Sequence, residues 1–241
     1  MSISKQTIEQ IEFVSTFTVE LVELAGSDQR ICEAARVSTI GAESAGTDES
    51  KGLINFLVSN RHGSPLEHGM LTFRISAPIF VWREFMRHRI GFSYNEESGR
   101  YKRLEPKFYV PGISRPLVQV GKPGAYSFIA GSDSQYEETL SDLGIAYCTA
   151  WDSYVNMLEN GVAKEIARAC LPVAIYSTAY VTCNPRSLMS FLSLRTKEVD
   201  SKFPSYPQHE IEQVARGMEA IFAEEFPITY EAFNKAGRVS P

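Results

Sequence analysis

The order of strand-like and helix-like patterns along the chain is the feature that most limits its fold. Residues 70–76 alternate in the manner of a strand, and Ile79, Trp82 and Met86 then recur at the spacing of one helix face. Helices and strands alternate irregularly elsewhere, without an internal repeat of solenoid or propeller length. These patterns predict an α+β (mixed α/β) fold, with a central sheet covered by helices in a single domain over residues 1–241.

Local signals place the remaining elements. Ser50 and Asn184 are expected N-caps, and Pro185 suits the first turn of the helix that follows Asn184. Residues 90–103 are expected to form an ordered loop, and residues 111–133, rich in Gly and Pro, a surface excursion. No GxGxxG motif follows a strand, so a Rossmann fold is not indicated. Strands are further expected over residues 18–24 and 175–182, and helices over residues 28–37, 50–62, 79–89, 137–159, 163–171, 184–195 and 208–225.

Composition excludes several classes of protein. The 241 residues are 44% hydrophobic and 22% charged, which is typical of a globular chain. The longest apolar runs, residues 77–82 and 171–176, are far shorter than the roughly 20 residues that span a bilayer. The N-terminus as far as Glu12 lacks the apolar core of a secretory signal. A cytoplasmic location without membrane contact is therefore expected.

The four cysteines give no sign of a covalent or metal framework. Cys32, Cys148, Cys170 and Cys183 are widely separated and form no CxxC pair, so neither a zinc site nor a disulfide pattern is indicated. Because free cysteine is among the most frequently buried residue types, all four are expected to be reduced core residues.

Positive charge is concentrated in one short segment of an acidic chain. The net charge is −5, yet residues 83–103 hold six cations against three acids, which leaves −8 on the rest of the chain. Such a concentration predicts a small anionic ligand, because a nucleic-acid surface would need a wider basic field. No cysteine adjoins this segment in sequence, so catalysis by a thiolate is not expected.

The same segment carries groups suited to a phosphate. Ser98 offers a hydroxyl, Gly99 lets backbone amides approach, and Arg100 can bind two oxygens at once. No general base stands at a recognisable spacing from Ser98, which favours hydrogen bonding over nucleophilic attack.

The segment from Arg87 to Tyr101 resembles a family signature. Arg87-His88-Arg89, Ser93, Asn95, Ser98, Arg100 and Tyr101 are similar to the RHRxxSxNxxSxRY pattern of the flavin-dependent thymidylate synthases. The resemblance continues through residues 62–68, 77–81, 165–172 and 184–195, and so covers most of the chain.

The resemblance implies an enzyme that makes dTMP from dUMP with bound FAD. Methylenetetrahydrofolate (5,10-methylenetetrahydrofolate) would give the carbon and NADPH the reducing equivalents. Hydride can pass from a reduced flavin to the uracil ring without a protein nucleophile. The resemblance also implies a homotetramer whose active sites form between subunits.

The family positions that match this chain imply two sets of site residues. Cofactor contacts are implied for His62, Ser64, Arg87, His88, Arg89, Glu96, Asn184, Arg186 and Ser190. Contacts with dUMP are implied for Glu84, Arg87, Glu96, Glu97, Ser98, Gly99, Arg100, Arg168 and Arg195. Arg195 is the catalytic candidate, because a permanently charged guanidinium can stabilise charge that develops on the uracil ring. Arg186 lies nine residues before Arg195 on one expected helix, about half a turn away, so the two should point to opposite sides.

The chain departs from the family pattern near the signature. One extra residue stands between Arg89 and Ser93, which predicts a bulge at Gly91. Where relatives often carry Gln, this chain has Glu84, and a carboxylate near a phosphate needs a compensating cation such as Arg87.

Two more departures lie toward the C-terminus. Ser190 stands where family members tend to have the longer Asn. Residues 196–207 exceed the corresponding family segment, which predicts a displaced loop over the flavin.

Two other interpretations use different residues. A non-catalytic nucleotide- or RNA-binding module would use Arg100, Tyr101 and Arg103. A metal hydrolase would use His62, Glu67, His68 and His88. The chain has no HExxH motif, and no metal is expected.

Overall fold

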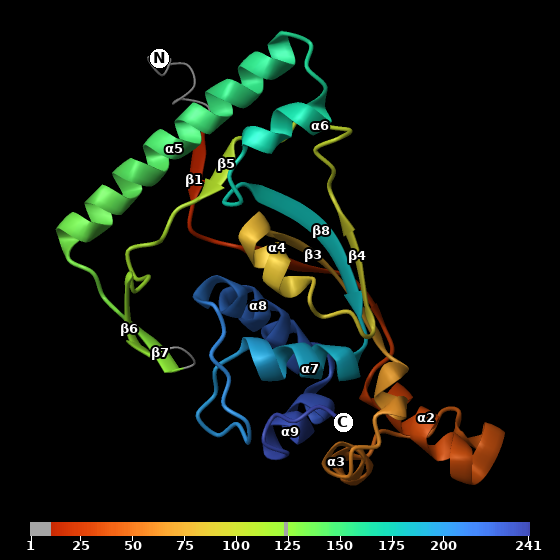
Figure 1. Cartoon of the computed structure of the whole chain (residues 1–241). Helices are drawn as coiled ribbons and strands as arrows, with labels where there is room; N and C mark the ends of the chain where they lie inside the picture. The colour runs from red at the N-terminus through yellow and green to blue at the C-terminus, as the bar shows by residue number, and fades with distance from the viewer. Residues whose placement is uncertain (1–10, 123–124) are drawn as a thin grey trace. The chain divides into compact units, whose positions relative to one another are not determined.

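The computed structural model describes residues 11–122 and 125–241 (Figure 1). The expectation that the N-terminus is not a secretory signal concerns residues 1–12, and residues 1–10 lie outside the described residues. The chain forms two compact units of interleaved segments. Of the described residues, unit 1 comprises 11–16, 76–83, 96–122 and 125–178, and unit 2 comprises 17–75, 84–95 and 179–241. The expectation of a single domain over the whole chain stays a prediction.

An open four-stranded sheet has the strand order β2-β3-β8-β4. Its strands are β2 (Thr18–Ala25), β3 (Met70–Pro78), β4 (Phe92–Glu96) and β8 (Tyr176–Cys183). The predicted α+β class is confirmed, but β4 lies where an irregular loop was expected. Half-buried Phe92, Tyr94 and Glu96 alternate with exposed Ser93 and Asn95, which is the period of a strand. Because this segment is rich in polar residues, its alternation was not recognised in the sequence as that of a strand.

Unit 1 contains the long helix α5 (Asp133–Glu159). A capping box starts the helix: the amide of Gln135 donates to Ser132 Oγ at 3.2 Å, and the amide of Ser132 donates to Gln135 Oε1 at 2.9 Å. The helix therefore begins four residues before its expected start. Figure 1 shows α5 beside the parallel pair of β1 (Glu12–Val14) and β5 (Lys107–Tyr109). The core of this unit includes Phe108, Tyr147, Trp151, Tyr154 and Ile175.

The other elements of unit 1 correct two expectations. The expected surface excursion contains an antiparallel hairpin of β6 (Val118–Lys122) and β7 (Ala125–Ile129). The expected helix over residues 163–171 divides into α6 (Lys164–Ala167) and the 3-10 helix η3 (Arg168–Cys170). Cys170 is exposed at the end of this tight turn, so the prediction that all four cysteines are core residues is wrong there. Cys32, Cys148 and Cys183 are buried as predicted.

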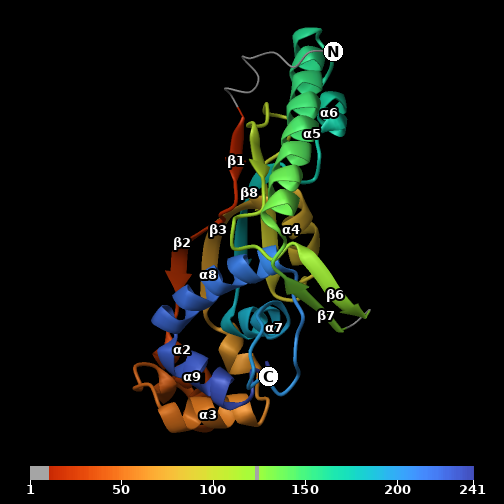
Figure 2. The ribbon, with the colours of Figure 1, turned by 90° about the vertical axis from the view of Figure 1, so that its left-hand side faces the viewer.

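Unit 2 is mainly helical. The side chain of Asn184 accepts from the Ser187 amide at 2.8 Å and caps α7 (Pro185–Arg195), as predicted. The apolar residues of α7 are buried, and α8 (His209–Glu225) packs beside the helix and on β2. A Cβ at Gly217 would stand 3.0 Å from Val19 Cγ2, so glycine permits close approach of α8 to the strand (Figure 2). The remaining helical elements are α2 (Asp28–Ile40), η1 (Gly41–Ser44), α3 (Lys51–Ser59), η2 (Ser64–Glu67) and α9 (Pro227–Lys235).

Helix α4 (Ile79–Phe85) is shorter than its periodicity suggested. The amide of His88 donates to the Phe85 carbonyl at 3.0 Å, an i to i+3 bond that ends the helix in a tight turn. The expected helix to Arg89 was therefore too long, because its last residues form this turn.

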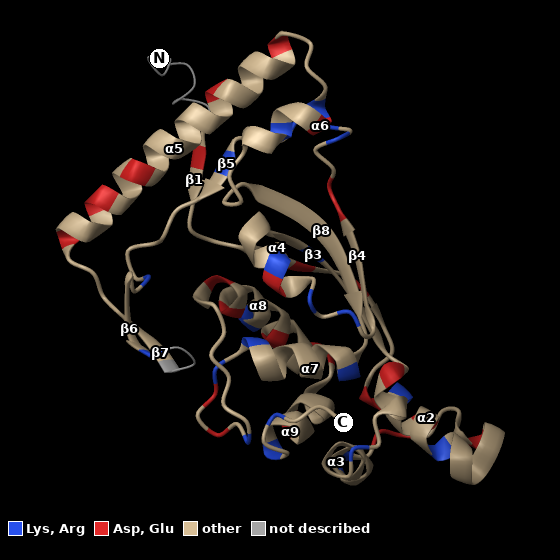
Figure 3. Cartoon of the chain, in the orientation of Figure 1, with Lys and Arg blue, Asp and Glu red and all other residues tan. Residues whose placement is uncertain are grey.

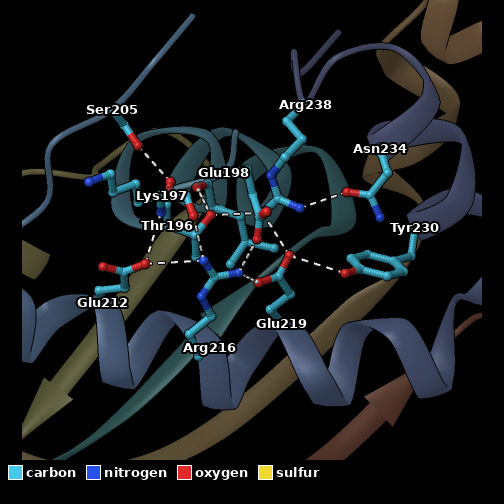
Figure 4. A network of polar contacts seen from close by, with 11 residues as sticks. Thr196, Lys197, Glu198, Ser205, Glu212, Arg216, Glu219, Tyr230, Asn234 and Arg238 are labelled. Carbon is cyan, nitrogen blue, oxygen red and sulfur yellow. Dashed lines mark hydrogen bonds and ion pairs between the residues drawn. The ribbon is translucent and has the colours of Figure 1, made fainter. Parts of the chain in front are cut away.

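A polar network holds the segment that follows α7 (Figure 4). Arg216 on α8 donates to the Lys197 carbonyl at 2.7 Å and pairs with Glu198. Arg238 donates to Thr196 Oγ1 at 2.7 Å and forms an ion pair with Glu219 on α8. The longer segment is thus tied to α8 and to the C-terminal residues of unit 2.

Candidate active site

The first cavity lies in unit 1 at the end of β4. It encloses about 430 Å³. One wall is apolar and includes Ile79, Leu104, Leu171 and Ile175. The polar lining consists of Glu96, Glu97, Ser98, Gly99, Arg168, Tyr176 and Ser177. An apolar cavity with a few convergent polar groups is typical of a small-molecule site.

The turn after β4 favours glycine for a steric reason. Gly99 is buried, and a Cβ there would stand 3.1 Å from Arg168 Cδ and 3.2 Å from Leu104 Cδ1. The Arg100 amide donates to Ser98 Oγ at 3.3 Å, which tightens the turn. The structure therefore brings Ser98 and Gly99 to the same cavity as Arg168, although about seventy residues separate them in sequence.

The two arginines near this cavity differ in their partners. Arg100 Nε lies 2.8 Å from Glu165 Oε2, and both side chains are about half exposed. The Arg168 guanidinium has neither a hydrogen bond nor an ion pair with another described residue, although Arg168 lines the cavity. Its uncompensated charge makes Arg168 well suited to an anionic ligand group.

The adjacent carboxylates Glu96 and Glu97 have different surroundings. Ser177 Oγ donates to Glu96 Oε1 at 2.6 Å. Glu97 Oε1 accepts from the Thr178 amide at 3.0 Å, while its Oε2 lies 2.8 Å from Lys102 Nζ. Glu97 is therefore held by structural contacts through both oxygens, and Glu96 is held through one.

The second cavity lies in unit 2, where the signature begins. It encloses about 380 Å³. Its lining residues are Arg87, His88, Arg89, Ile90, Phe92, Ser187 and Ser190. Two guanidinium groups and two hydroxyls form a donor set that fits the diphosphate of a dinucleotide such as FAD.

The backbone turns beside this cavity at Gly91. Its φ is +69°, a conformation that favours glycine, and a Cβ would collide with the hydroxyl of Ser187. This left-handed turn at Gly91 lies where a bulge was predicted for the extra residue of the signature.

Arg195 is held by two residues from the α4 region. Its Nε donates to His88 Nε2 at 3.0 Å, and its Nη1 lies 2.9 Å from Glu84 Oε2. Tyr94 fixes the same turn, because its hydroxyl donates to the His88 carbonyl at 2.6 Å. Burial, together with the charges of Arg195 and Arg87, lowers the pKa of His88 to about 4. A neutral imidazole at neutral pH can accept the hydrogen bond from Arg195.

This histidine makes stability depend on pH in a defined direction. The unfolded chain binds a proton at His88 near pH 6.5 and the folded chain only near pH 4. The free energy of unfolding is therefore expected to fall as pH drops from 6.5 toward 4, by about 1 kcal/mol because solvent reaches the half-buried ring. Urea unfolding at pH 7 and pH 5 measures this loss, and a His88→Gln variant should lose less. An equal loss in both proteins would contradict the assignment.

Arg186 lies at the other end of α7 and has separate partners. It pairs with Glu67, and its Nε donates to the Pro241 carbonyl at 2.7 Å. A Cβ at Gly63 would collide with its guanidinium. Figure 3 shows basic residues at both ends of α7. Arg186 and Arg195 thus have no partner in common, and their opposite directions around α7 stay a prediction.

The remaining residues of the expected cofactor set are dispersed within unit 2. His62 is exposed, with its ring centroid 5.5 Å from that of Phe56. Ser64 is exposed at the start of η2, and Asn184 uses its side-chain oxygen as the α7 cap. Neither His62 nor Ser64 lines the cavity described for unit 2.

Two further properties concern the described residues as a whole. Within them, no group of three or more His, Cys, Asp or Glu side chains could hold a metal ion. The helices of the described ranges are also too short or too polar to cross a membrane.

Ser177 was missed by the sequence analysis. It lies on β8, a strand that was predicted only as a structural element, and its side chain is 3% exposed. A buried serine within an apolar strand was the available signal, because a buried hydroxyl needs a hydrogen-bond partner. Its partner, Glu96, is 81 residues away in sequence, so spacing could not identify the pair.

The two cation-bearing cavities of this α+β protein are suited by size and charge to anionic ligands. Residues 20–228 match the model of the thymidylate synthase complementing protein family. The flavin-dependent thymidylate synthase of Streptomyces avermitilis is 56% identical over 234 residues, 95% of each chain. That of Thermotoga neapolitana is 39% identical over 217 residues, 90% of each chain.

Solved structures agree with these relatives. The UMP/dUMP methylase PolB from Streptomyces cacaoi bound with 5-Br dUMP is 47% identical, with a TM-score of 0.90 over 96% of this chain and 100% of that chain. Its complex with 5-Br UMP gives a TM-score of 0.89 at 48% identity, with the same coverage. The chain belongs to the flavin-dependent thymidylate synthase family.

Proposed function

We propose that this protein converts dUMP to dTMP, with 5,10-methylenetetrahydrofolate as carbon donor, NADPH as reductant and FAD as bound cofactor. The observation that carries the proposal is the cavity of unit 1, where the signature residues Ser98 and Gly99 meet Arg168, whose guanidinium has no partner among the described residues. Family membership supports the same reaction.

The cavity of unit 1 supplies the groups that a pyrimidine monophosphate needs. Arg168, the hydroxyl of Ser98 and the backbone at Gly99 can bind phosphate oxygens, and Arg100 can join them by leaving Glu165. Glu96 can accept a hydrogen bond from a ribose hydroxyl or a ring N–H. We assign Glu97 to the support of this pocket, because both of its oxygens already have partners.

The residues of unit 2 can serve the cofactor and the reacting ring. Arg87, Arg89 and Ser190 line the cavity that fits the FAD diphosphate, with Arg186, Asn184, His62 and Ser64 as further contacts. A bound, reduced flavin would supply the hydride that passes to the uracil ring. Arg195, oriented by His88 and Glu84, stabilises negative charge on the uracil ring.

The state of the thiols supports a reaction without a cysteine nucleophile. Burial raises the pKa of Cys32, Cys148 and Cys183 above the ordinary thiol value, and partial desolvation raises that of Cys170. A raised pKa leaves little of the thiolate that nucleophilic attack requires. None of these cysteines lines either cavity described above.

Assembly and substrate range belong to the same proposal. We expect a cytoplasmic homotetramer whose active sites combine residues of neighbouring subunits. UMP is a second candidate substrate, because PolB bound with 5-Br UMP is among the similar structures. The two substrates differ at the ribose 2′ position, so they should be assayed side by side.

Release of tritium tests the reaction directly. The purified protein, saturated with FAD, is expected to show a flavin absorbance spectrum and to release tritium from dUMP labelled at C5. Formation of dTMP should require both NADPH and 5,10-methylenetetrahydrofolate. Parallel assays with labelled UMP measure the preference for the deoxyribose substrate.

Controls separate this reaction from the alternatives. A protein that neither carries nor takes up FAD would contradict the proposal, as would FAD-bound protein that forms no methylated nucleotide. A chelator should leave turnover unchanged, because the described residues contain no group of three or more His, Cys, Asp or Glu side chains that could hold a metal ion.

A further inference from the structure

The buried hydroxyl of Ser177 lines the cavity of unit 1, and the proposed reaction assigns it no role. Ser177 lies on β8, next to β4 in the sheet, and its side chain is only 3% exposed. Its Oγ donates to Glu96 Oε1 at 2.6 Å, a short contact that joins the two strands. Hydrogen bonds to ionised carboxylates are among the stronger ones in proteins.

The backbone at Ser177 is itself anchored. The indole Nε1 of Trp82 donates to the Ser177 carbonyl at 3.0 Å and to the Ala77 carbonyl at 3.1 Å. Trp82 is 2% exposed and belongs to α4. The buried Trp82 ring therefore fixes the carbonyl of Ser177. Because the backbone is fixed there, the position of the Ser177 hydroxyl is restricted as well.

The hydrogen-bond partners of Glu96 and Glu97 differ, and the difference indicates what the Ser177 hydroxyl does. Both oxygens of Glu97 are engaged, by the Thr178 amide and by Lys102. Glu96 Oε2 accepts no hydrogen bond from any described residue. The Ser177 contact thus fixes one oxygen of Glu96, a residue that lines the cavity, and leaves the other oxygen without a partner among the described residues.

We propose that Ser177 is a positioning residue for nucleotide binding. It holds the Glu96 carboxylate so that Oε2 accepts a hydrogen bond from an N–H or O–H group of a pyrimidine nucleoside monophosphate. The proposal rests on the proposed function, because dUMP is the ligand placed in this cavity. Ser177 acts through Glu96 and does not touch the reacting atoms.

Three substitutions of Ser177 test the proposal. Ser177→Ala removes the donor and is expected to raise both the calorimetric Kd and the KM for dUMP about tenfold, with kcat changed by less than about threefold. Ser177→Thr keeps the hydroxyl and should remain within about threefold of the wild type. Ser177→Cys, a weaker donor of similar size, should lie between them, and it carries the test if the alanine variant does not fold.

A double-mutant cycle shows whether Ser177 acts through Glu96. In a Glu96→Ala background, Ser177→Ala should raise the Kd for dUMP by less than about twofold, because the group that it positions is absent. Thr182 offers a matched control on the same strand: its hydroxyl lies 3.0 Å from that of Thr72, and it does not line the cavity. Thr182→Val should leave the Kd for dUMP unchanged.

The outcomes separate this inference from the proposed function. If the wild-type protein does not bind dUMP, the proposed function fails and the inference fails with it. If the wild type binds dUMP and Ser177→Ala binds it equally well, the inference alone is overturned. An equal loss of affinity from Ser177→Ala with and without Glu96 also overturns it, because Ser177 would then act by another route.

Discussion

Replacement of Arg195 by alanine is expected to lower dTMP formation at least about 100- to 1000-fold while FAD stays bound. The guanidinium is oriented by the acceptor His88 Nε2 and by the carboxylate of Glu84. Negative charge that develops on a uracil ring is stabilised best by a cation that is already in place, because no reorganisation is then needed. The loss should therefore appear mainly in kcat, measured as dTMP formed at saturating dUMP.

Two matched variants distinguish this effect from a general disturbance. Arg195→Lys keeps a positive charge beside Glu84 but loses the planar geometry, so it should retain FAD and recover only part of the rate. Arg186→Ala, at the opposite end of α7, should weaken FAD binding more than it lowers kcat at saturating FAD. Full turnover by Arg195→Ala would disprove the catalytic assignment.

The local part of the fold could be predicted from the sequence. Ser50 and Asn184 cap helices as their residue types suggested, and the strand over residues 175–182 is β8 with a shift of one residue. Each of these features depends on interactions within a few residues. Gly91 was also predictable, because one extra residue in a tight turn demands a backbone that other residues rarely adopt.

The long-range part could not be predicted in the same way. The pairs Ser177 with Glu96 and Arg195 with His88 join positions 81 and 107 residues apart. Such contacts depend on strand order and helix packing, and hydrophobic periodicity along the sequence predicts neither of these. The early end of α4 has the same origin: its turn is fixed by Tyr94 on β4, outside the helix itself.

The candidate site was predictable to the extent that the signature is continuous in sequence. Residues 96–99 stay together at one cavity because they follow one strand. Arg168 reaches the same cavity only through the fold of unit 1. Its expected contact with dUMP was implied by the resemblance to the family and not by its spacing from the signature. The close approach of its side chain to Gly99, where an added Cβ would stand 3.1 Å from Arg168 Cδ, places Arg168 beside the signature, which spacing in sequence could not do.

Replacement of Arg168 by alanine is expected to raise the KM for dUMP about 10- to 100-fold. Arg168 lines the cavity of unit 1 without an ion-pair partner among the described residues, so its charge is available to a phosphate. The phosphate group does not react, and its binding should contribute equally to the ground state and the transition state. The expected signature is a raised KM and calorimetric Kd with kcat changed little.

The phosphate assignment can be separated from a packing effect. Deoxyuridine has no phosphate, so its binding as a competitor should be weakened less than about twofold by Arg168→Ala, while Arg168→Lys should recover part of the dUMP affinity. Arg103 is a matched control in unit 1: its guanidinium lies 5.8 Å from the centroid of the Trp151 ring, and it does not line the cavity. Arg103→Ala should leave the KM for dUMP unchanged. Equal losses for dUMP and deoxyuridine in Arg168→Ala would place the phosphate elsewhere, because removing a phosphate contact cannot weaken a ligand that lacks the phosphate.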